Sequence, residues 1–391
     1  MEDNQSFCNV QSDLVKPVLL YLAAEDWAFV SHRLPMARAA RDSGFNVHVA
    51  TNVTAHAAAI CGEGFTLHAI PLRRGGLSPL SALATIKAVR DIKRDIKPTI
   101  SHHSGLQCCV LGGIAELGNP IRTLQINALT GLGYAFTSRS LGARAGKFAI
   151  TTLLKLLLNQ SNSVALVQNP DDHAVLEDLG ISPDQIMRIP GSGVDTELLI
   201  PLPEPAGPVV VGFAGRLLVD KGIRALVIAH RLLRTRGLDI RLLIAGGPDP
   251  ANPASISQAE AESWNTEPGI TWLGQISDIT SLWRRSHIAA LPSHREGLPK
   301  SLLEAAASGR PMVATDAPGC REIVLQNRTG LLVPIEDPEA LADAIATLAT
   351  SQELRKRYGL AARQLVVEKM SAQAIGAAIV ALYEEQLRRA R

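Results

Sequence analysis

Short apolar runs alternate along this chain with longer segments whose apolar residues recur at helical spacing. Such runs are typical of buried parallel strands, and crossovers of helical length predict a doubly wound α/β sheet. In the first half the runs are VLLYLAA (18–24), NVHVAT (46–51), FTLHAI (65–70), PTISHH (98–103), IRTLQIN (121–127) and VALVQN (164–169). We predict helices over 34–44, 77–97 and 105–118, and a polar turn at AEDWAFVSHR (24–33).

A second alternating series begins at VVVGFAG (209–215), after the proline-rich stretch LIPLPEPAGP (199–208). Because 391 residues exceed one ordinary core, two domains of similar size are expected. We predict an N-terminal domain over 1–200, a linker over 201–208, a C-terminal domain over 209–370, and a helix over 371–391 that could pack back on the N-terminal domain.

Composition narrows the class of protein. A net charge of +2 gives no general attraction to nucleic acid, and no nucleic-acid-binding signature is present, so no such partner is expected. Five cysteines without metal-ligand spacing favour a reduced, cytoplasmic setting. The N-terminal MEDNQSFCNVQSDLVK does not have the pattern of a signal peptide, and no apolar run approaches the roughly 20 residues that span a bilayer.

The segment RSLGARAGKFAITTLLKLLLNQ (139–160) interleaves basic residues with leucines and other apolar residues. A basic amphipathic helix can bury its apolar face at a lipid boundary while its cations meet anionic headgroups, so a peripheral membrane contact is one interpretation. The alternative is an ordinary helix packed on the sheet, because the C-terminal half of the segment is apolar on several faces.

Glu296 and Glu304 lie on either side of a predicted helix start in HREGLPKSLLE. Pro299 suits the beginning of a helix, and the first amides of that helix favour an anion. Glu296 would lie in the loop and Glu304 on the second turn, so that the two could reach different parts of one ligand. Alternatively, both are solvated surface carboxylates.

Arg216 and Lys221 follow a predicted strand in VGFAGRLLVDKGI, where doubly wound folds bind ligands. Gly215 allows a tight backbone turn there, and the two cations suit a diphosphate. Neither a dinucleotide-binding fingerprint nor a P-loop is present. Taken alone, the two cations are ordinary surface charges; together with the Glu296 helix they indicate a diphosphate site.

Three motifs, FAGRLLVDKG (213–222), LPSHREGLPKSLLEAAASGRPMVATDAPGCREIV (291–324) and TGLLVP (329–334), resemble the retaining glycosyltransferases of family 4. The resemblance covers most of 209–370 and implies the GT-B fold, with two Rossmann-like domains and a cleft between them. It implies that Arg216 and Lys221 hold the donor diphosphate, that Glu296 reaches the donor sugar, and that Glu304 binds the ribose. The backbone of Gly297 and Leu298 would lie near the phosphate, and no metal or other cofactor is implied.

The N-terminal half resembles a bacterial subgroup that builds lipid-linked oligosaccharides and polysaccharides on undecaprenyl diphosphate, in the segments FVSHRLPMARAARDSGFNVHVAT, NALTGLGYAF, VQNPDDHAVLEDLG and IPGSGVDT. Two features depart from the family: a glycine-rich loop after the first strand is missing, and Thr130 stands where many relatives have a histidine. His103, at a strand end, is a candidate for the group beside the transferred sugar, although strand-end histidines are often structural. Asn127, Thr130 and Gly193 are further candidates to line the cleft.

The sequence therefore predicts transfer, with retention, of a hexosyl or N-acetylhexosaminyl group from a nucleotide-diphospho-sugar to a polyprenyl-diphosphate-linked glycan. A nucleotide-sugar epimerase or hydrolase of the same fold is the alternative enzyme, since this architecture serves those reactions too. A non-catalytic nucleotide-sugar-binding protein is the other, and it would be expected to have lost some of Arg216, Lys221, Glu296 and Glu304, all of which are present.

Overall fold

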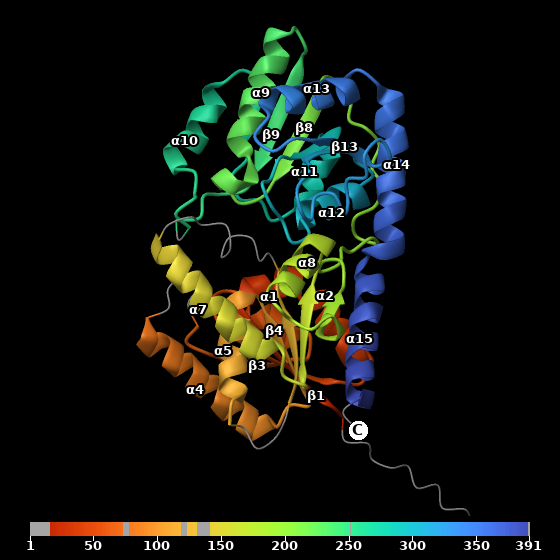
Figure 1. Ribbon diagram of the computed structural model, residues 1–391. Coiled ribbons are helices and arrows are strands. Elements are labelled where there is room, and N and C mark those ends of the chain that lie inside the picture. Colours follow the sequence, from red (N-terminus) through yellow and green to blue (C-terminus); the bar gives the residue numbers. More distant parts are fainter. Residues whose placement is uncertain (1–15, 73–77, 119–122, 131–140, 251, 390–391) are drawn as a thin grey trace, which may run out of the picture.

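Two lobes stacked end to end make up the molecule, each built around a parallel sheet with helices on its faces (Figure 1). The computed structural model describes residues 16–72, 78–118, 123–130, 141–250 and 252–389, with the backbone alone for 141–149. The N-terminal 15 residues and most of the loop after Thr130 therefore lie outside the described residues. The predicted α/β class with two doubly wound parallel sheets is confirmed.

The N-terminal sheet has seven strands in the order β3-β2-β1-β4-β5-β6-β7. All its strands are parallel, and the order in which successive strands are added reverses between β1 and β4, where Leu19 pairs with Ile100. Every residue of β6 is buried, as expected for a strand covered on both faces. The strands are β1 (Val18–Glu25), β2 (Asn46–Asn52), β3 (Thr66–Ala69), β4 (Ile100–Ser104), β5 (Leu124–Ala128), β6 (Ser163–Val167) and β7 (Ile186–Arg188).

Helices join these strands: α1 (Asp26–His32), α2 (Leu34–Asp42), α3 (Ala57–Gly62), α4 (Pro79–Ile96), α5 (Leu106–Glu116), α7 (Leu141–Leu158) and α8 (Pro170–Asp178), with a 3-10 turn at Pro183–Gln185. The polar turn predicted at 24–33 is wrong, because α1 occupies that segment. Asp26 begins α1, and its buried carboxylate accepts hydrogen bonds from the backbone N–H groups of Thr54, at 2.7 Å, and His56, at 2.8 Å. These contacts to the β2–α3 loop hold a helix that is too short to show a periodic pattern.

The C-terminal sheet has six strands in the order β10-β9-β8-β11-β12-β13, with its reversal between β8 and β11. Its strands are β8 (Val209–Ala214), β9 (Ile240–Ala245), β10 (Ile270–Trp272), β11 (Ile288–Leu291), β12 (Met312–Thr315) and β13 (Gly330–Val333). Its helices are α9 (Ile223–Thr235), α10 (Gln258–Ser263), α11 (Ile279–Arg285), α12 (Lys300–Ala307), α13 (Pro338–Ala349) and α14 (Gln352–Lys369), with 3-10 turns at Val219–Lys221 and Trp264–Thr266.

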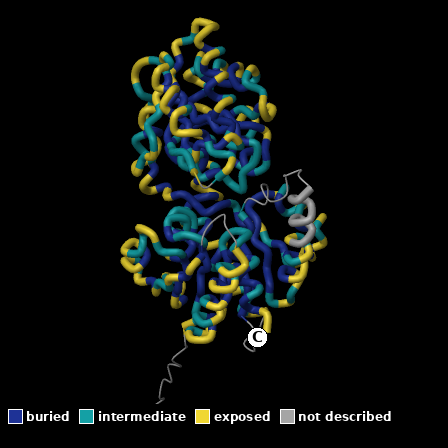
Figure 2. Tube along the Cα trace, turned by 90° about the vertical axis from the view of Figure 1, so that its left-hand side faces the viewer, coloured by how far each residue is buried: buried dark blue, intermediate teal, exposed yellow. Residues whose placement is uncertain are grey.

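The last helix, α15 (Ala372–Arg389), returns to the N-terminal lobe and packs against α2 (Figure 1). The hydroxyl of Tyr383 is hydrogen-bonded to the hydroxyl of Tyr21 at 2.9 Å and to Nδ1 of His102 at 2.6 Å, inside the N-terminal core. Figure 2 shows the buried residues gathered in two centres, one in each lobe. The chain crosses between the lobes twice, and the two crossings pair where Val194 meets Ser371.

The described half of α7 packs on the sheet through Leu154, Leu157 and Leu158, each at most 3% exposed. Leu156 on the opposite side is 66% exposed. Among the described residues, no helix is both long and apolar enough to cross a bilayer.

Candidate functional site

The reversal between β8 and β11 brings together the loops that follow these two strands. Ligands bind at such reversals because the loops diverge there and leave a crevice at the carboxyl ends of the strands. Lys221, after β8, forms an ion pair with Glu296, after β11. Ser293 donates a hydrogen bond from Oγ to Oε1 of Glu296 at 2.6 Å. The side chains of Lys221 and Glu296 are 21% and 10% exposed, so the pair is shielded from bulk solvent but accessible to a ligand.

Gly222 explains how Lys221 reaches this position. Its φ is +68°, and a Cβ atom added there would lie 2.0 Å from the carbonyl oxygen of Pro292. Only glycine allows this left-handed conformation together with such a close approach of two backbones. The 3-10 turn Val219–Lys221 is thereby pressed against the end of β11.

Helix α12 begins directly behind this pair, with Pro299 as its N-cap residue. Proline has no side-chain acceptor for the first amides of the helix, and the N–H of Leu302 already donates to the carbonyl of Pro299. The N–H groups of Lys300 and Ser301 and the helix dipole are the groups that an anion can use. Glu304 lies on the second turn with its side chain 14% exposed. Burial raises the pKa of Glu304 to about 7, against the opposing effect of Lys300, whose Nζ lies 3.7 Å away.

Arg216 lies after the same strand as Lys221 and forms an ion pair of 2.6 Å with Asp249, from the loop after β9. Its side chain is 42% exposed. Four predicted residues, Arg216, Lys221, Glu296 and Glu304, therefore belong to loops and a helix start at one edge of the C-terminal sheet.

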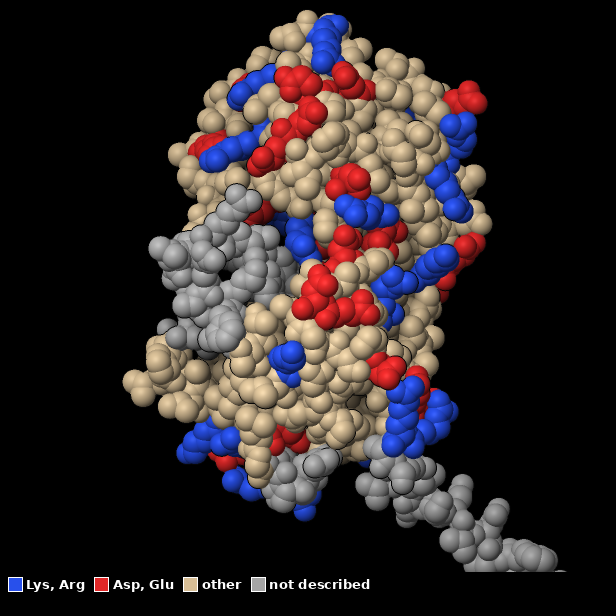
Figure 3. Space-filling view, in the orientation of Figure 1, with Lys and Arg blue, Asp and Glu red and all other residues tan. Residues whose placement is uncertain are grey.

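This edge faces the N-terminal lobe. Nζ of Lys300, on the first turn of α12, donates a hydrogen bond of 2.8 Å to the carbonyl oxygen of Ser31 in α1. Charged side chains of both signs gather at the boundary between the lobes in the view of Figure 3. The site is thus a set of cations, carboxylates and helix amides that faces the N-terminal lobe, and it suits a ligand carrying a diphosphate and several hydroxyl groups.

Two family models match the chain, one for each lobe. "Glycosyl transferase 4-like" matches 18–169, and "Glycosyl transferases group 1" matches 208–351. The chain belongs to the family 4 type of GT-B glycosyltransferases. The family of the earlier resemblance is therefore confirmed, and both lobes contribute to that result.

Curated relatives of this glycosyltransferase family include the capsular polysaccharide biosynthesis glycosyltransferase CapM of Staphylococcus aureus, with 28% identity over 46% of this chain and 47% of the relative. The chain spans about half the length of CapM in that match. A longer match is to the N,N'-diacetylbacillosaminyl-diphospho-undecaprenol alpha-1,3-N-acetylgalactosaminyltransferase of Campylobacter jejuni, with 24% identity over 83% of this chain and 87% of the relative.

Solved structures show the same fold. Sucrose-phosphate synthase from Thermosynechococcus elongatus superposes with a TM-score of 0.80 at 21% identity, over 96% of this chain and 100% of that one. Anabaena HepE, solved in complex with UDP-glucose, superposes with a TM-score of 0.74 at 17% identity, over 94% of this chain and 99% of that one. At these identities the likeness establishes the fold alone.

The structure does not bring His103 and Asn127 to the cluster. Both lie in the interior of the N-terminal sheet, at 0% and 2% exposure, with Nδ1 of His103 2.8 Å from Oδ1 of Asn127. Burial lowers the pKa of His103 to about 3. Its Nε2 edge faces Gly112, where an added Cβ atom would lie 2.5 Å from that nitrogen. A role of His103 beside the transferred sugar stays a prediction.

The remaining predicted residues are distributed over both lobes and the crossing between them. Thr130, partly exposed, follows β5, and the backbone N–H of Gly215 donates to the carbonyl of Ala245 at 3.0 Å. Gly193, with φ of +77°, lies at the crossing between the lobes, where an added Cβ atom would be 2.9 Å from Cα of Ala372. Gly297 and Leu298 precede α12, and Cδ2 of Leu298 would lie 2.5 Å from a Cβ atom at Gly191.

His32, at the end of α1, was not singled out from the sequence. Burial lowers its pKa to about 3, and nearby cations act in the same direction. These cations are Arg33 of its own lobe and Lys300, Lys221 and Arg216 of the other. The imidazole of His32 is therefore neutral and lies near the cations of the C-terminal lobe. Its position soon after the first strand, where this fold places ligands, is the signal that could have identified it.

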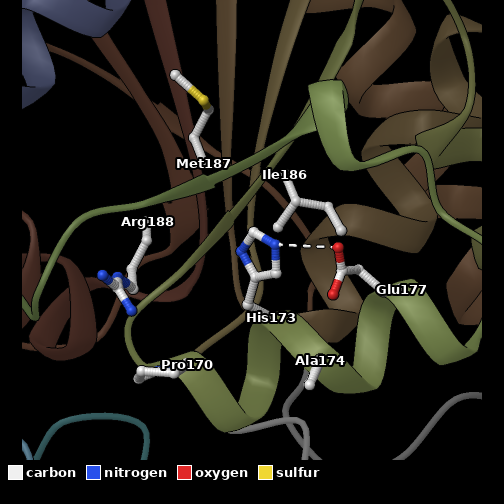
Figure 4. A pocket seen from close by; sticks show the side chains of 7 residues that line it. All are labelled: Pro170, His173, Ala174, Glu177, Ile186, Met187 and Arg188. Carbon is white, nitrogen blue, oxygen red and sulfur yellow. Dashed lines mark ion pairs between the residues drawn. The ribbon is translucent and has the colours of Figure 1, made fainter.

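A shallow pocket lies elsewhere, between α8 and the edge strand β7 (Figure 4). His173 and Glu177 face each other across one turn of α8, with 3.6 Å between Nε2 and Oε1, and Arg188 lies on the opposite wall. None of the predicted site residues lines this pocket. The candidate site therefore remains the edge of the C-terminal sheet.

Proposed function

We propose that this chain transfers a sugar, with retention of anomeric configuration, from a nucleotide-diphospho-sugar to a hydroxyl group of a polyprenyl-diphosphate-linked glycan. The observation that carries the proposal is the Lys221–Glu296 pair beside the free N-terminus of α12. A diphosphate can replace Glu296 as the partner of Lys221 while the helix amides bind its oxygens. Glu296 is then released to accept hydrogen bonds from the sugar hydroxyls.

Each residue of the cluster takes one part of the donor. Lys221 and Arg216 bind the diphosphate, Glu296 the transferred sugar, and Glu304 the ribose hydroxyls as a hydrogen-bond acceptor. The acceptor hydroxyl attacks from the face that the diphosphate leaves, and a departing phosphate oxygen takes its proton. The protein contributes positioning and electrostatic stabilisation, each charged contact being worth about 2 to 4 kcal/mol in the transition state, without a metal ion.

The acceptor belongs, in this proposal, to the N-terminal lobe. The Campylobacter relative is named for a diphospho-undecaprenol acceptor, which supports a lipid-linked glycan as the class of substrate. Leu156 and Ile150 on α7 are exposed at 66% and 36%. This exposure of apolar side chains supports peripheral attachment to the inner face of the cytoplasmic membrane through 139–160.

The direct test is a matrix of nucleotide sugars against polyprenyl-diphosphate-linked glycans, read out by product mass. UDP-sugars come first, because HepE was solved with UDP-glucose. A product heavier than the acceptor by one sugar residue, formed with retention, is the expected result. Epimerised donor or free sugar without any transfer product across the matrix would contradict the proposal.

A further inference from the structure

The loop that carries Glu296 is held by the other lobe. Nδ2 of Asn169, at the start of α8, donates a hydrogen bond of 2.7 Å to the carbonyl oxygen of Gly297 and lies 3.4 Å from that of Glu296. Asp172, in the first turn of α8, forms an ion pair with Arg295. The residues on both sides of Glu296 are thus bound by one turn of the N-terminal lobe.

That turn is also held by hydrogen bonds of its own. Oδ1 of Asn169 caps α8 by accepting a hydrogen bond of 2.7 Å from the backbone N–H of Asp172. Nδ2 of Asn169 also donates to Oδ2 of Asp172 at 2.9 Å. Both side chains are 0% exposed, so each has a fixed orientation and every amide hydrogen of Asn169 has an acceptor. The turn therefore presents a preformed donor and a preformed carboxylate to the C-terminal lobe.

The opposite side of the loop rests on its own lobe. The backbone N–H of Glu296 donates to the carbonyl of Pro318 at 3.0 Å. Gly319 has φ of +77°, and an added Cβ atom there would lie 2.6 Å from the carbonyl oxygens of both Glu296 and Gly297. Within its own lobe the loop is thus held by the backbone at 318–319 and by the contacts of the Glu296 side chain with Ser293 and Lys221. The contacts of the Gly297 carbonyl with Asn169 and of Arg295 with Asp172 exist only when the lobes meet.

We propose that Asn169 and Asp172 are positioning residues that place Glu296 for the donor sugar only when the two lobes are closed. This inference rests on the proposed function, in which Glu296 binds the transferred sugar. Lys221 and Arg216 belong to the same lobe as the donor site and need no such contact to hold the diphosphate. When the lobes open, the donor stays bound, but the loop loses its contacts with Asn169 and Asp172. The donor sugar is then not aligned for transfer.

The test is Asn169→Ser, which keeps an oxygen suited to capping α8 and removes the amide donor to Gly297. We expect kcat for transfer to fall about tenfold or more, while the donor Kd changes less than about twofold. The matched control is Ser351→Ala, which removes the cap of α14 and touches no part of the loop. That control lowers thermal stability and leaves kcat unchanged, which shows that loss of a helix cap alone does not slow transfer. An unchanged kcat in Asn169→Ser, or a loss confined to donor Kd, overturns the proposal.

Arg295→Gln removes the ion pair with Asp172, which is the second contact between α8 and the loop. Because the Arg295 side chain is 26% exposed, this variant can be used if Asn169→Ser does not fold. We expect the same pattern, with a lower kcat at an unchanged donor Kd. An Arg295→Gln protein with normal kcat overturns the role of Asp172.

A double-mutant cycle separates positioning from mere structural support. If Asn169 acts through Glu296, Asn169→Ser adds nothing to the loss caused by Glu296→Ala. Equal losses in both backgrounds overturn the proposal. Near-normal transfer by Glu296→Ala would contradict the proposed function on which the inference rests. An inactive Glu296→Ala together with a fully active Asn169→Ser would contradict only the positioning role of Asn169.

Discussion

The strand order of both sheets reverses at equivalent places, and the residues at the two reversals differ. In the C-terminal sheet, the strands at the reversal are β8 and β11, and they lead to the partly exposed pair Lys221 and Glu296. In the N-terminal sheet, the corresponding strands β1 and β4 carry Tyr21, His102 and His103, all fully buried. The same topology therefore occurs twice, but the charged pair of the C-terminal sheet follows its strands, whereas these three N-terminal side chains belong to the strands themselves and point into the core.

The largest expected effect concerns the C-terminal reversal. Lys221→Ala should lower the rate of transfer by about a hundredfold or more, because a cation is lost where the diphosphate leaves. Glu296→Ala should lower it by a similar factor. Steady-state kinetics checks this result, with circular dichroism to confirm the fold. Arg231→Ala is the matched control, since its guanidinium is 55% exposed on α9 and paired with Glu267. Near-normal turnover by Lys221→Ala or Glu296→Ala would contradict the assignment of these residues to the donor site.

The N-terminal reversal should respond in stability instead. His103→Ala removes the buried partner of Asn127 and leaves a cavity beside Gly112, so the free energy of unfolding should fall by about 2 to 4 kcal/mol. Denaturant unfolding measures this change. His173→Ala, at a surface histidine on α8 whose side chain is 32% exposed, should change it by less than about 0.5 kcal/mol. If His103→Ala were stable and inactive, His103 would act in catalysis and the contrast between the two reversals would be lost.

The ionisation of Glu304 should make the stability of the protein depend on pH. Its pKa rises from 4.5 in the unfolded chain to about 7 in the folded protein, so its favourable contribution to stability is complete below pH 4.5 and is lost as pH rises through 7. Glu304→Gln should therefore be more stable than the natural protein at pH 8, by about 1 to 2 kcal/mol, and nearly equal at pH 4. Thermal unfolding at the two pH values measures the difference. The exposed Glu353→Gln is the control, and a pH-independent difference for Glu304→Gln would contradict the assignment.

An effect on stability alone is expected at the helix that packs the C-terminal segment on the N-terminal lobe. Tyr383→Phe removes a hydroxyl group bonded to Tyr21 and His102, and should lower the free energy of unfolding by about 1 to 2 kcal/mol. Transfer per folded molecule should stay unchanged. Denaturant unfolding and kinetics on the same samples check both statements. A large loss of transfer without loss of stability would place this buried network in the reaction.

Much of the fold could be predicted because burial on both faces gives the parallel strands a continuous apolar pattern, as in β6. The short α1 could not, since seven residues show no periodicity and Asp26 starts the helix through contacts with the distant residues Thr54 and His56. His103 illustrates the same limit at the level of the site. Whether a polar residue near a strand end faces a cleft or the core depends on the neighbouring helices, here on Gly112 of α5.

The grouping of Lys221 with Glu296 could be anticipated, because both follow strands that meet at one sheet edge. The contacts of Lys300 with Ser31 and of Asn169 with Gly297 could not, since they depend on how the two lobes face each other. Sequence periodicity describes each sheet separately and contains no information on that orientation.

The most direct measurement is calorimetric titration of the protein with a panel of nucleoside diphosphates. The account predicts that at least one of them binds the natural protein and Arg231→Ala with equal Kd, and binds Lys221→Ala at least about tenfold more weakly, as the loss of one charged phosphate contact requires. Absence of binding across the panel, or equal Kd for Lys221→Ala and the natural protein, would contradict the assignment of the β8–β11 edge as the donor site.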